Sequence, residues 1–164
     1  MVRIVVMGPS GAGKSAVGAA LAAQLAVPFV DADDLHPPAN VAKMAAGTSL
    51  DDEDRMPWLD LVGEALATAP GMVVACSALA RRYRDRLRMA AVDVRFVELR
   101  VPRTELDRRM RAREHFMPAS LLESQLTMLE HLAADEPGVV VENTGSIAEV
   151  AGHAATALRA QSLR

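Results

Sequence analysis

The segment from Gly8 to Ser15, G-P-S-G-A-G-K-S, has the residue types and spacing of a phosphate-binding loop. It fits the pattern G-x-x-x-x-G-K-[ST] at every position, and it lies between an apolar run and a stretch with helical periodicity. Glycines let backbone N–H groups converge on phosphate oxygens, and the following helix N-terminus adds positive potential. Lys14 would place a charge on the β- and γ-phosphates, and Ser15 would be a ligand of Mg²⁺. The predicted ATP-binding residues are Gly8, Ser10, Gly11, Ala12, Gly13, Lys14 and Ser15.

The same glycines admit a second interpretation. Gly11, Gly13 and Ala16 satisfy G-x-G-x-x-[GA], and acidic residues follow about 20 positions later, as in a dinucleotide-binding fold. That pattern gives the lysine and the serine of the loop no function, so the phosphate loop is the favoured interpretation. A glycine turn that binds no ligand is the remaining alternative.

Two carboxylates follow the next apolar run of the chain. Asp31 and Asp33 come directly after Phe29-Val30 and alternate, so both can face the same side of a strand end. In open α/β sheets, ligands bind beyond the carboxyl ends of the strands. A small-molecule kinase needs a base near the attacking hydroxyl and an acidic group for Mg²⁺. We predict Asp33 as the base and Asp31 as the metal-binding group. The alternative is an acidic loop that caps the next helix, and for Asp34 this alternative is the preferred interpretation.

A parallel sheet is needed to bring these groups together. Helices are expected over residues 14–26, 38–46, 57–68, 81–89, 104–113, 121–132 and 147–158, with His115-Phe116-Met117-Pro118 as a break. Strands are expected at 2–7, from 29 to the acidic pair, and at 72–76, 94–99 and 139–141. Strands that alternate with helices predict one α/β domain over 1–164, with a parallel sheet covered on both faces.

Composition excludes several classes of protein. The chain of 164 residues is 51% hydrophobic and 24% charged, which is typical of a globular domain. Its net charge of −3 gives no overall field that would attract nucleic acid or an anionic membrane surface. The one cysteine excludes an internal disulfide, and the apolar stretch 16–30 is too short to span a bilayer. We therefore expect a cytoplasmic protein with a small-molecule substrate and with neither nucleic acid nor membrane as a partner.

Further motifs give the chain a resemblance to bacterial-type gluconokinases. They are Asp31–Pro37, Asn40, Lys43-Met44, Asp54-Arg55, Pro57-Trp58-Leu59, Cys76–Leu79, Tyr83-Arg84-Asp85, His115–Pro118 and Ser124-Gln125. The resemblance implies a three-layer phosphate-loop kinase fold, with a five-stranded parallel sheet and a mobile lid at about 109–125. It also implies transfer of a phosphoryl group from ATP to D-gluconate with Mg²⁺, and it suggests a homodimer.

The same resemblance assigns candidate residues for the acceptor. His36, Lys43 and Arg55 are expected to contact gluconate, and Arg55 is expected to fork its carboxylate, because guanidinium binds carboxylate in a bidentate manner. Arg81 is a further candidate, since it follows Ala80, where the family usually has lysine. The alternatives are a structural histidine, a solvated lysine and a surface ion pair for Arg55.

Two arginines are candidates for the nucleotide side. Arg109 and Arg113 are four apart on one predicted helix face, and in kinases of this fold the lid arginines close over the ATP phosphates. The resemblance implies that Arg113, together with Lys14, stabilises the phosphoryl group in flight. A solvated helix face is the alternative.

Three other functions stay open from sequence alone. One is another small-molecule kinase, acting on shikimate or a nucleotide. The second is a nucleotide-binding switch, against which the lack of an Asn-Lys-x-Asp segment counts. The third is a nicotinamide oxidoreductase, which follows from the dinucleotide interpretation of the glycines.

Overall fold

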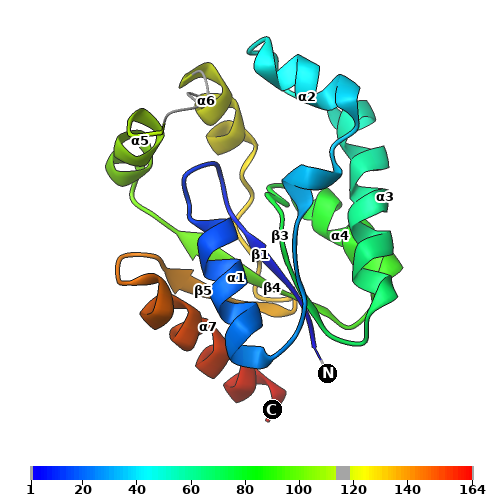
Figure 1. The fold of residues 1–164 in the computed structure, drawn as a ribbon, viewed down its shortest axis with the longest axis vertical. Coiled ribbons are helices and arrows are strands. Elements are labelled where there is room, and N and C mark those ends of the chain that lie inside the picture. Colours follow the sequence, from blue (N-terminus) through cyan, green and yellow to red (C-terminus); the bar gives the residue numbers. More distant parts are fainter. Residues whose placement is uncertain (1, 114–118, 164) are drawn as a thin grey trace.

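Five parallel strands form the centre of the fold, in the spatial order β2-β3-β1-β4-β5 (Figure 1). The computed structural model describes residues 2–113 and 119–163. The strands are β1 (Arg3–Met7), β2 (Phe29–Asp31), β3 (Met72–Ala75), β4 (Val94–Arg100) and β5 (Gly138–Glu142). In the central register Val5 lies between Val74 of β3 and Phe96 of β4, and all three are fully buried. Such apolar strands are typical of a parallel sheet that is covered on both faces.

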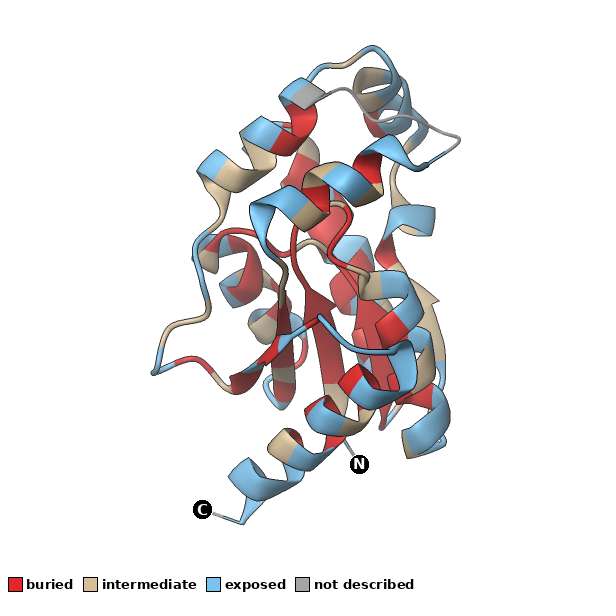
Figure 2. Ribbon diagram, turned by 90° about the vertical axis from the view of Figure 1, so that its left-hand side faces the viewer, coloured by how far each residue is buried: buried red, intermediate tan, exposed pale blue. Residues whose placement is uncertain are grey.

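Helices cover both faces of this sheet. They are α1 (Lys14–Leu25), α2 (Pro38–Ala45), α3 (Asp52–Thr68), α4 (Arg81–Ala90), α5 (Arg103–Arg111), α6 (Ala119–Met128) and α7 (Ile147–Ser162), with a short 3₁₀ helix η1 (Ala32–Leu35). One core cluster joins the sheet to α1 and α7, and the other joins it to α3 and α4. Figure 2 shows the buried residues concentrated in the sheet between these layers. The predicted three-layer α/β class is confirmed.

The remaining helices α2, α5 and α6 lie beyond the carboxyl ends of the strands (Figure 1). This is the end of the sheet where the loop after β1 and the acidic residues after β2 emerge. The three helices therefore surround the region that the sequence predicts to bind ligands.

Helix α3 begins earlier than the sequence analysis predicted. The sequence predicts Pro57 in the first turn, but the helix starts at Asp52, and Pro57 lies inside it. A capping box explains the difference, because the Asp51 side chain accepts from the Asp54 amide while the Asp54 side chain accepts from the Asp51 amide. Five further residues thus become helical, and Arg55 is placed one turn before Trp58 on the same helix.

Helix α6 ends earlier than predicted, at Met128 instead of Leu132. Beyond it the Glu130 amide donates to the Leu79 carbonyl at 2.8 Å, and the Leu132 amide donates to the buried Glu98 carboxylate at 2.9 Å. Tertiary hydrogen bonds of this segment replace the helical ones. The predicted break at His115–Pro118 lies outside the described residues. Within 2–113 and 119–163, every helix is too short or too polar to cross a bilayer.

Candidate active site

The loop between β1 and α1 has the backbone shape that a phosphate site requires. Gly13 has φ +90°, and a Cβ there would lie 2.5 Å from the Asn143 amide nitrogen, so only glycine fits. Asn143 in turn donates to the Ala12 carbonyl at 2.7 Å. Lys14 folds back over the loop and donates to the Pro9 carbonyl at 3.0 Å. Burial lowers the pKa of Lys14, and the nearby carboxylate charges oppose that shift.

Ser15, Asp31 and Asp33 are joined by hydrogen bonds at the end of β2. The Ser15 hydroxyl donates to Asp31 Oδ2 at 2.5 Å, and Asp31 Oδ1 accepts from the Asp33 amide at 3.0 Å, which caps η1. A hydroxyl and a carboxylate beside a phosphate loop are a donor set that suits Mg²⁺, which prefers oxygen ligands and keeps several waters. The Asp33 side chain is left 71% exposed, which makes its carboxylate accessible to a ligand.

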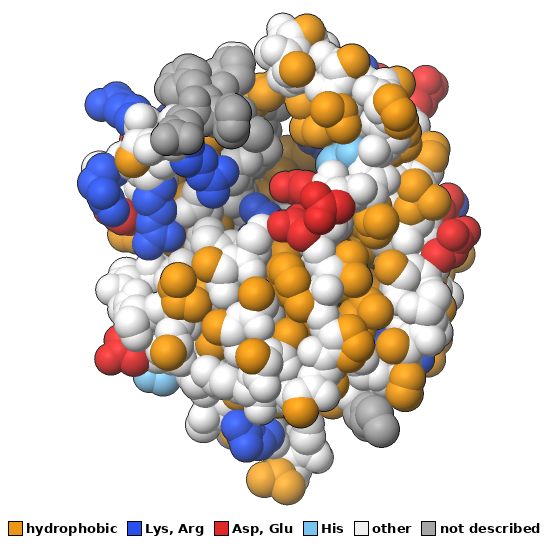
Figure 3. Space-filling view, in the orientation of Figure 1, with side chains coloured by type: hydrophobic (Ala, Val, Ile, Leu, Met, Phe, Trp, Pro, Cys, Tyr) orange, Lys and Arg blue, Asp and Glu red, His pale blue; other side chains and the backbone are white. Residues whose placement is uncertain are grey.

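A cavity of about 650 Å³ opens beside the loop. Its polar lining comes from the phosphate loop and the start of α1, from η1 and the residue after it, from α3 and α6, and from the segments before α3 and after β3. The polar lining residues are Ser10, Lys14, Asp33, His36, Ser49, Arg55, Ser77, Ser124 and Gln125. Figure 3 shows this hollow between the α2 side of the molecule and the side that carries α5 and α6, with acidic side chains at its rim. The structure thus brings the predicted residues Lys14, Asp33, His36 and Arg55 to one cavity.

His36 is fixed in orientation by its neighbours. Its ring stacks on Trp58 at a centroid distance of 4.0 Å. Asn40 Nδ2 lies 3.3 Å from His36 Nδ1 and 3.1 Å from the Asp54 carbonyl. Because that carbonyl can only accept, the Asn40 nitrogen is the donor in both bonds, and His36 Nδ1 is an acceptor. In the neutral ring the proton is therefore on Nε2, which lies 3.9 Å from Asp33 Oδ1.

Arg55 is a buried cation within the same cavity. It is 7% exposed, and its guanidinium lies 5.5 Å from the Tyr83 ring centroid and donates to the Tyr83 hydroxyl at 3.3 Å. Among the described residues, none places a carboxylate oxygen within ion-pair distance of it, which differs from the surface ion pair considered above. Burial lowers the pKa of His36; Asp33 opposes that shift and Arg55 adds to it, so the histidine lies close to both charges. A buried guanidinium without a carboxylate partner indicates an anion site.

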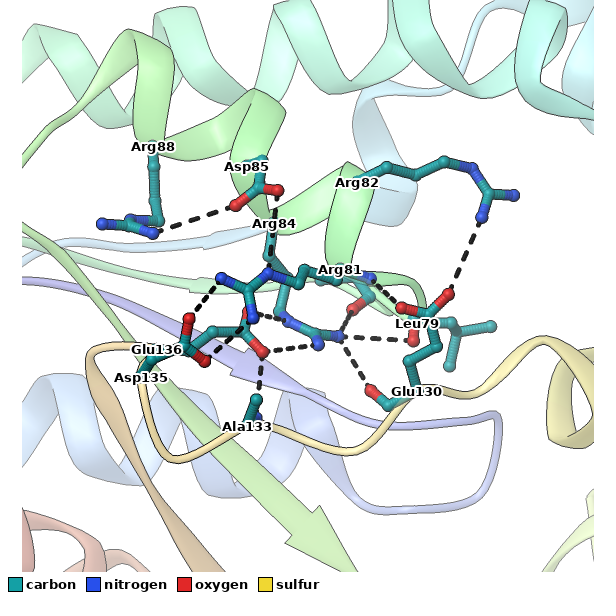
Figure 4. Close-up of polar contacts among 11 residues, drawn as sticks. Leu79, Arg81, Arg82, Arg84, Asp85, Arg88, Glu130, Ala133, Asp135 and Glu136 are labelled. Carbon is teal, nitrogen blue, oxygen red and sulfur yellow. Dashed lines mark hydrogen bonds and ion pairs between the residues drawn. The ribbon is translucent and has the colours of Figure 1, made fainter.

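Lys43 and Arg81 are not among the described residues that line the cavity, so their contact with the acceptor stays a prediction. Lys43 forms an ion pair with Asp54 at 2.6 Å, and that hydrogen bond is the main reason why its pKa is raised. Arg81 forms a forked ion pair with Asp135 at 2.9 and 2.7 Å (Figure 4). Both side chains therefore connect structural elements in this arrangement.

The two predicted nucleotide-side arginines differ in their surroundings. Arg109 lies over the phosphate loop, donating to the Gly11 carbonyl at 3.1 Å and to the Asn143 carbonyl at 3.2 Å. Arg113 is exposed, and its charge adds to the lowering of the Lys14 pKa, of which burial is the largest cause. Arg109 thus contacts the phosphate loop directly.

Helix α6 contributes two site residues to which the sequence analysis gave no role. The Gln125 carbonyl oxygen accepts from the Ser10 backbone amide of the phosphate loop at 2.8 Å. Next to it, the hydroxyls of Ser49 and Ser124 are 2.8 Å apart. Both residues are among the motifs of the sequence resemblance, but their contacts depend on the packing of α6 over the loop.

Comparisons with known proteins agree with this geometry. A family model described as an AAA domain matches residues 4–134. Gluconokinase from Gluconobacter oxydans is 48% identical over 143 residues, which is 84% of this chain and 80% of that protein. The crystal structure of a gluconokinase from Sinorhizobium meliloti superimposes with a TM-score of 0.91 at 45% identity, over 98% of this chain and 93% of that one.

A shikimate kinase from Aquifex aeolicus has a TM-score of 0.64 at 18% identity, over 99% of both chains, which shows a shared fold alone. The fold and the loop after β1 define the class of phosphate-loop small-molecule kinases. Within that class, the chain belongs to the gluconokinase family, as the sequence resemblance implied.

Proposed function

We propose that this protein is a gluconokinase that transfers the γ-phosphoryl group of ATP to the terminal hydroxyl of D-gluconate, giving ADP and 6-phospho-D-gluconate. The observation that carries the proposal is the placement of Arg55 in the cavity of Lys14 and Asp33. An anion site within a cavity that also contacts the phosphate loop suits an acceptor with a carboxylate at one end and a hydroxyl at the other.

We assign roles in this reaction to four residues of the polar lining and to Arg113. Arg55 holds the carboxylate, and the Nε2–H of His36 donates to a hydroxyl of the chain. Asp33 accepts the proton of the attacking hydroxyl, which places the new negative charge on the oxygen that bonds to phosphorus. Lys14 and Arg113 stabilise the charge on the phosphoryl group during transfer.

Ser15 and Asp31 would hold Mg²⁺ at the loop. When bound, the ion neutralises charge on the phosphate oxygens. Arg109 would lie on the nucleotide side, where it already contacts the loop and the segment after β5.

An acceptor panel tests the proposal. We expect release of ADP from ATP with D-gluconate, and only background release with shikimate, AMP or glucose. Glucose is the informative control, because it offers a terminal hydroxyl without the carboxylate that Arg55 would bind. Turnover with shikimate or AMP that exceeds turnover with gluconate would assign the chain a different acceptor.

A further inference from the structure

Tyr83 of α4 is a buried phenol whose hydroxyl contacts three charged groups. It is 2% exposed. Its oxygen lies 2.5 Å from Asp52 Oδ1, 3.1 Å from Arg82 Nη2 and 3.3 Å from Arg55 Nη1. The Met128 sulfur, a weak acceptor, lies at 3.5 Å. Tyr83 thus connects the cavity arginine to an ion pair near the surface.

The hydrogen bonds of this cluster have one consistent arrangement. A carboxylate can only accept and a guanidinium can only donate, so the Tyr83 proton goes to Asp52, and its lone pairs face Arg55 and Arg82. Hydrogen bonds from Arg82 and Tyr83 lower the pKa of Asp52 to about 2, so it is ionised at neutral pH. Burial, followed by the bond to Asp52, raises the pKa of Tyr83, so the phenol keeps its proton.

The far end of the cluster is anchored by a fork. Arg82 donates to Asp52 through Nε at 2.8 Å and through Nη2 at 3.0 Å. These two residues come from α4 and from the first turn of α3, the helix that also carries Arg55. The Tyr83 hydroxyl is therefore held in place independently of any ligand.

We propose that Tyr83 is a positioning residue, which holds Arg55 by one Nη1–H so that the rest of the guanidinium edge is presented to the carboxylate of the acceptor. This rests on the function proposed for Arg55. Arginine has a long side chain with many rotamers, and bidentate recognition of a carboxylate needs one defined guanidinium plane. Contact with one nitrogen and with the ring face restricts that plane while leaving donors for the ligand.

The test is a double-mutant cycle with Tyr83→Phe and Arg55→Leu. Phenylalanine keeps the ring and removes only the hydroxyl. We expect Tyr83→Phe to raise the KM for gluconate about tenfold, in line with loss of one hydrogen bond to a charged group. The KM for ATP and kcat should change less than about twofold, since Tyr83 is not among the residues that line the cavity. In the Arg55→Leu background, Tyr83→Phe should cause little further increase in the KM for gluconate.

The outcomes separate this inference from the proposed function. If wild-type protein does not phosphorylate gluconate, the proposed function fails. If Arg55→Leu raises the KM for gluconate but Tyr83→Phe does not, or if the two effects multiply independently, Tyr83 does not act through Arg55.

Should Tyr83→Phe fail to fold, Asp52→Ala removes the anchor at an exposed site and should shift the KM for gluconate in the same direction. Arg86→Leu, which breaks the surface pair with Asp60, is the control and should shift neither KM.

Discussion

Asp31 and Asp33 are two positions apart, yet their carboxylates have different surroundings. Asp31 uses both oxygens within the protein, accepting from the Ser15 hydroxyl and from the amide that begins η1. Asp33 has an exposed carboxylate that lines the acceptor cavity near Nε2 of His36. These surroundings fit the roles proposed above, with Asp31 on the metal side of the site and Asp33 as the base.

These surroundings predict different losses on substitution. Asp33→Asn keeps the shape but cannot accept the proton, and we expect kcat to fall about 10²- to 10⁴-fold while ATP still binds. Asp31→Asn should lose activity that higher Mg²⁺ partly restores. Steady-state kinetics across a magnesium titration measures both. If Asp33→Asn turns over normally and Asp31→Asn is inactive at every Mg²⁺ concentration, the two roles are exchanged; if both are active, the base lies elsewhere.

At the scale of elements, helix α6 connects the nucleotide and acceptor sides. The Gln125 side-chain oxygen accepts from the Ser10 amide of the phosphate loop, and the hydroxyl of the neighbouring Ser124 contacts that of Ser49, which precedes α3. Phosphate oxygens of a bound triphosphate would compete with the Gln125 oxygen for loop amides, because such amides are what a phosphate loop offers to its ligand.

This competition predicts tighter nucleotide binding when the carboxamide is removed. Gln125→Leu should lower the Kd for a nonhydrolysable ATP analogue about two- to tenfold, which corresponds to one net hydrogen bond. Gln125→Glu should raise it, since a carboxylate repels the phosphates. Isothermal titration calorimetry measures both, with Ser124→Ala as the matched control that leaves the loop contact intact. Unchanged or weaker binding by Gln125→Leu would mean that this contact does not oppose the nucleotide.

Local patterns could be predicted from the sequence, and long-range contacts could not. The phosphate loop was predictable because its glycines and lysine have a mechanism that needs them at fixed spacing. The start of α3 was missed because Pro57 is a strong helix-start signal, whereas the Asp51–Asp54 capping box that begins the helix uses aspartate instead of the usual glutamate. The contact of Gln125 is with Ser10, 115 positions away in the sequence. The contacts of Tyr83 are with Asp52 and Arg55, which are 31 and 28 positions away. No periodicity in a single sequence contains that information.

At the scale of the whole molecule, a buried ion pair joins α4 to the segment before β5. Arg84 is fully buried and forks Glu136 at 2.6 and 2.8 Å (Figure 4). Its Nη1 also donates to the carbonyls of Ala78, Leu79 and Glu130. The guanidinium thereby links the segment after β3, which ends at the cavity wall, to the segment after α6.

The pH dependence of this pair follows from Glu136. Burial alone would raise the pKa of Glu136, but the hydrogen bonds from Arg84 and from the Ala133 amide outweigh it, so the pKa is lowered. Because the pKa of Glu136 is lower in the folded state, its ionised carboxylate stabilises the protein at pH values above the unfolded-state pKa, which is near 4.3. That contribution is lost as the pH falls through the folded-state pKa.

Removing one partner should therefore destabilise the whole domain. We expect Arg84→Met to lower the free energy of unfolding by about 3–5 kcal/mol, because it leaves the Glu136 carboxylate buried without its cation. Glu136→Gln should lower the free energy of unfolding by a smaller amount, since the amide oxygen still accepts from Arg84. It should also make the free energy of unfolding depend less on pH in the acid range. The double variant Arg84→Met/Glu136→Leu should recover part of the loss, because no charge is then left buried. Urea unfolding at pH 7 and at pH values below 4 measures these free energies of unfolding. A loss below about 1 kcal/mol for Arg84→Met, the range of an exposed pair, would mean that the pair does not hold α4 to the sheet.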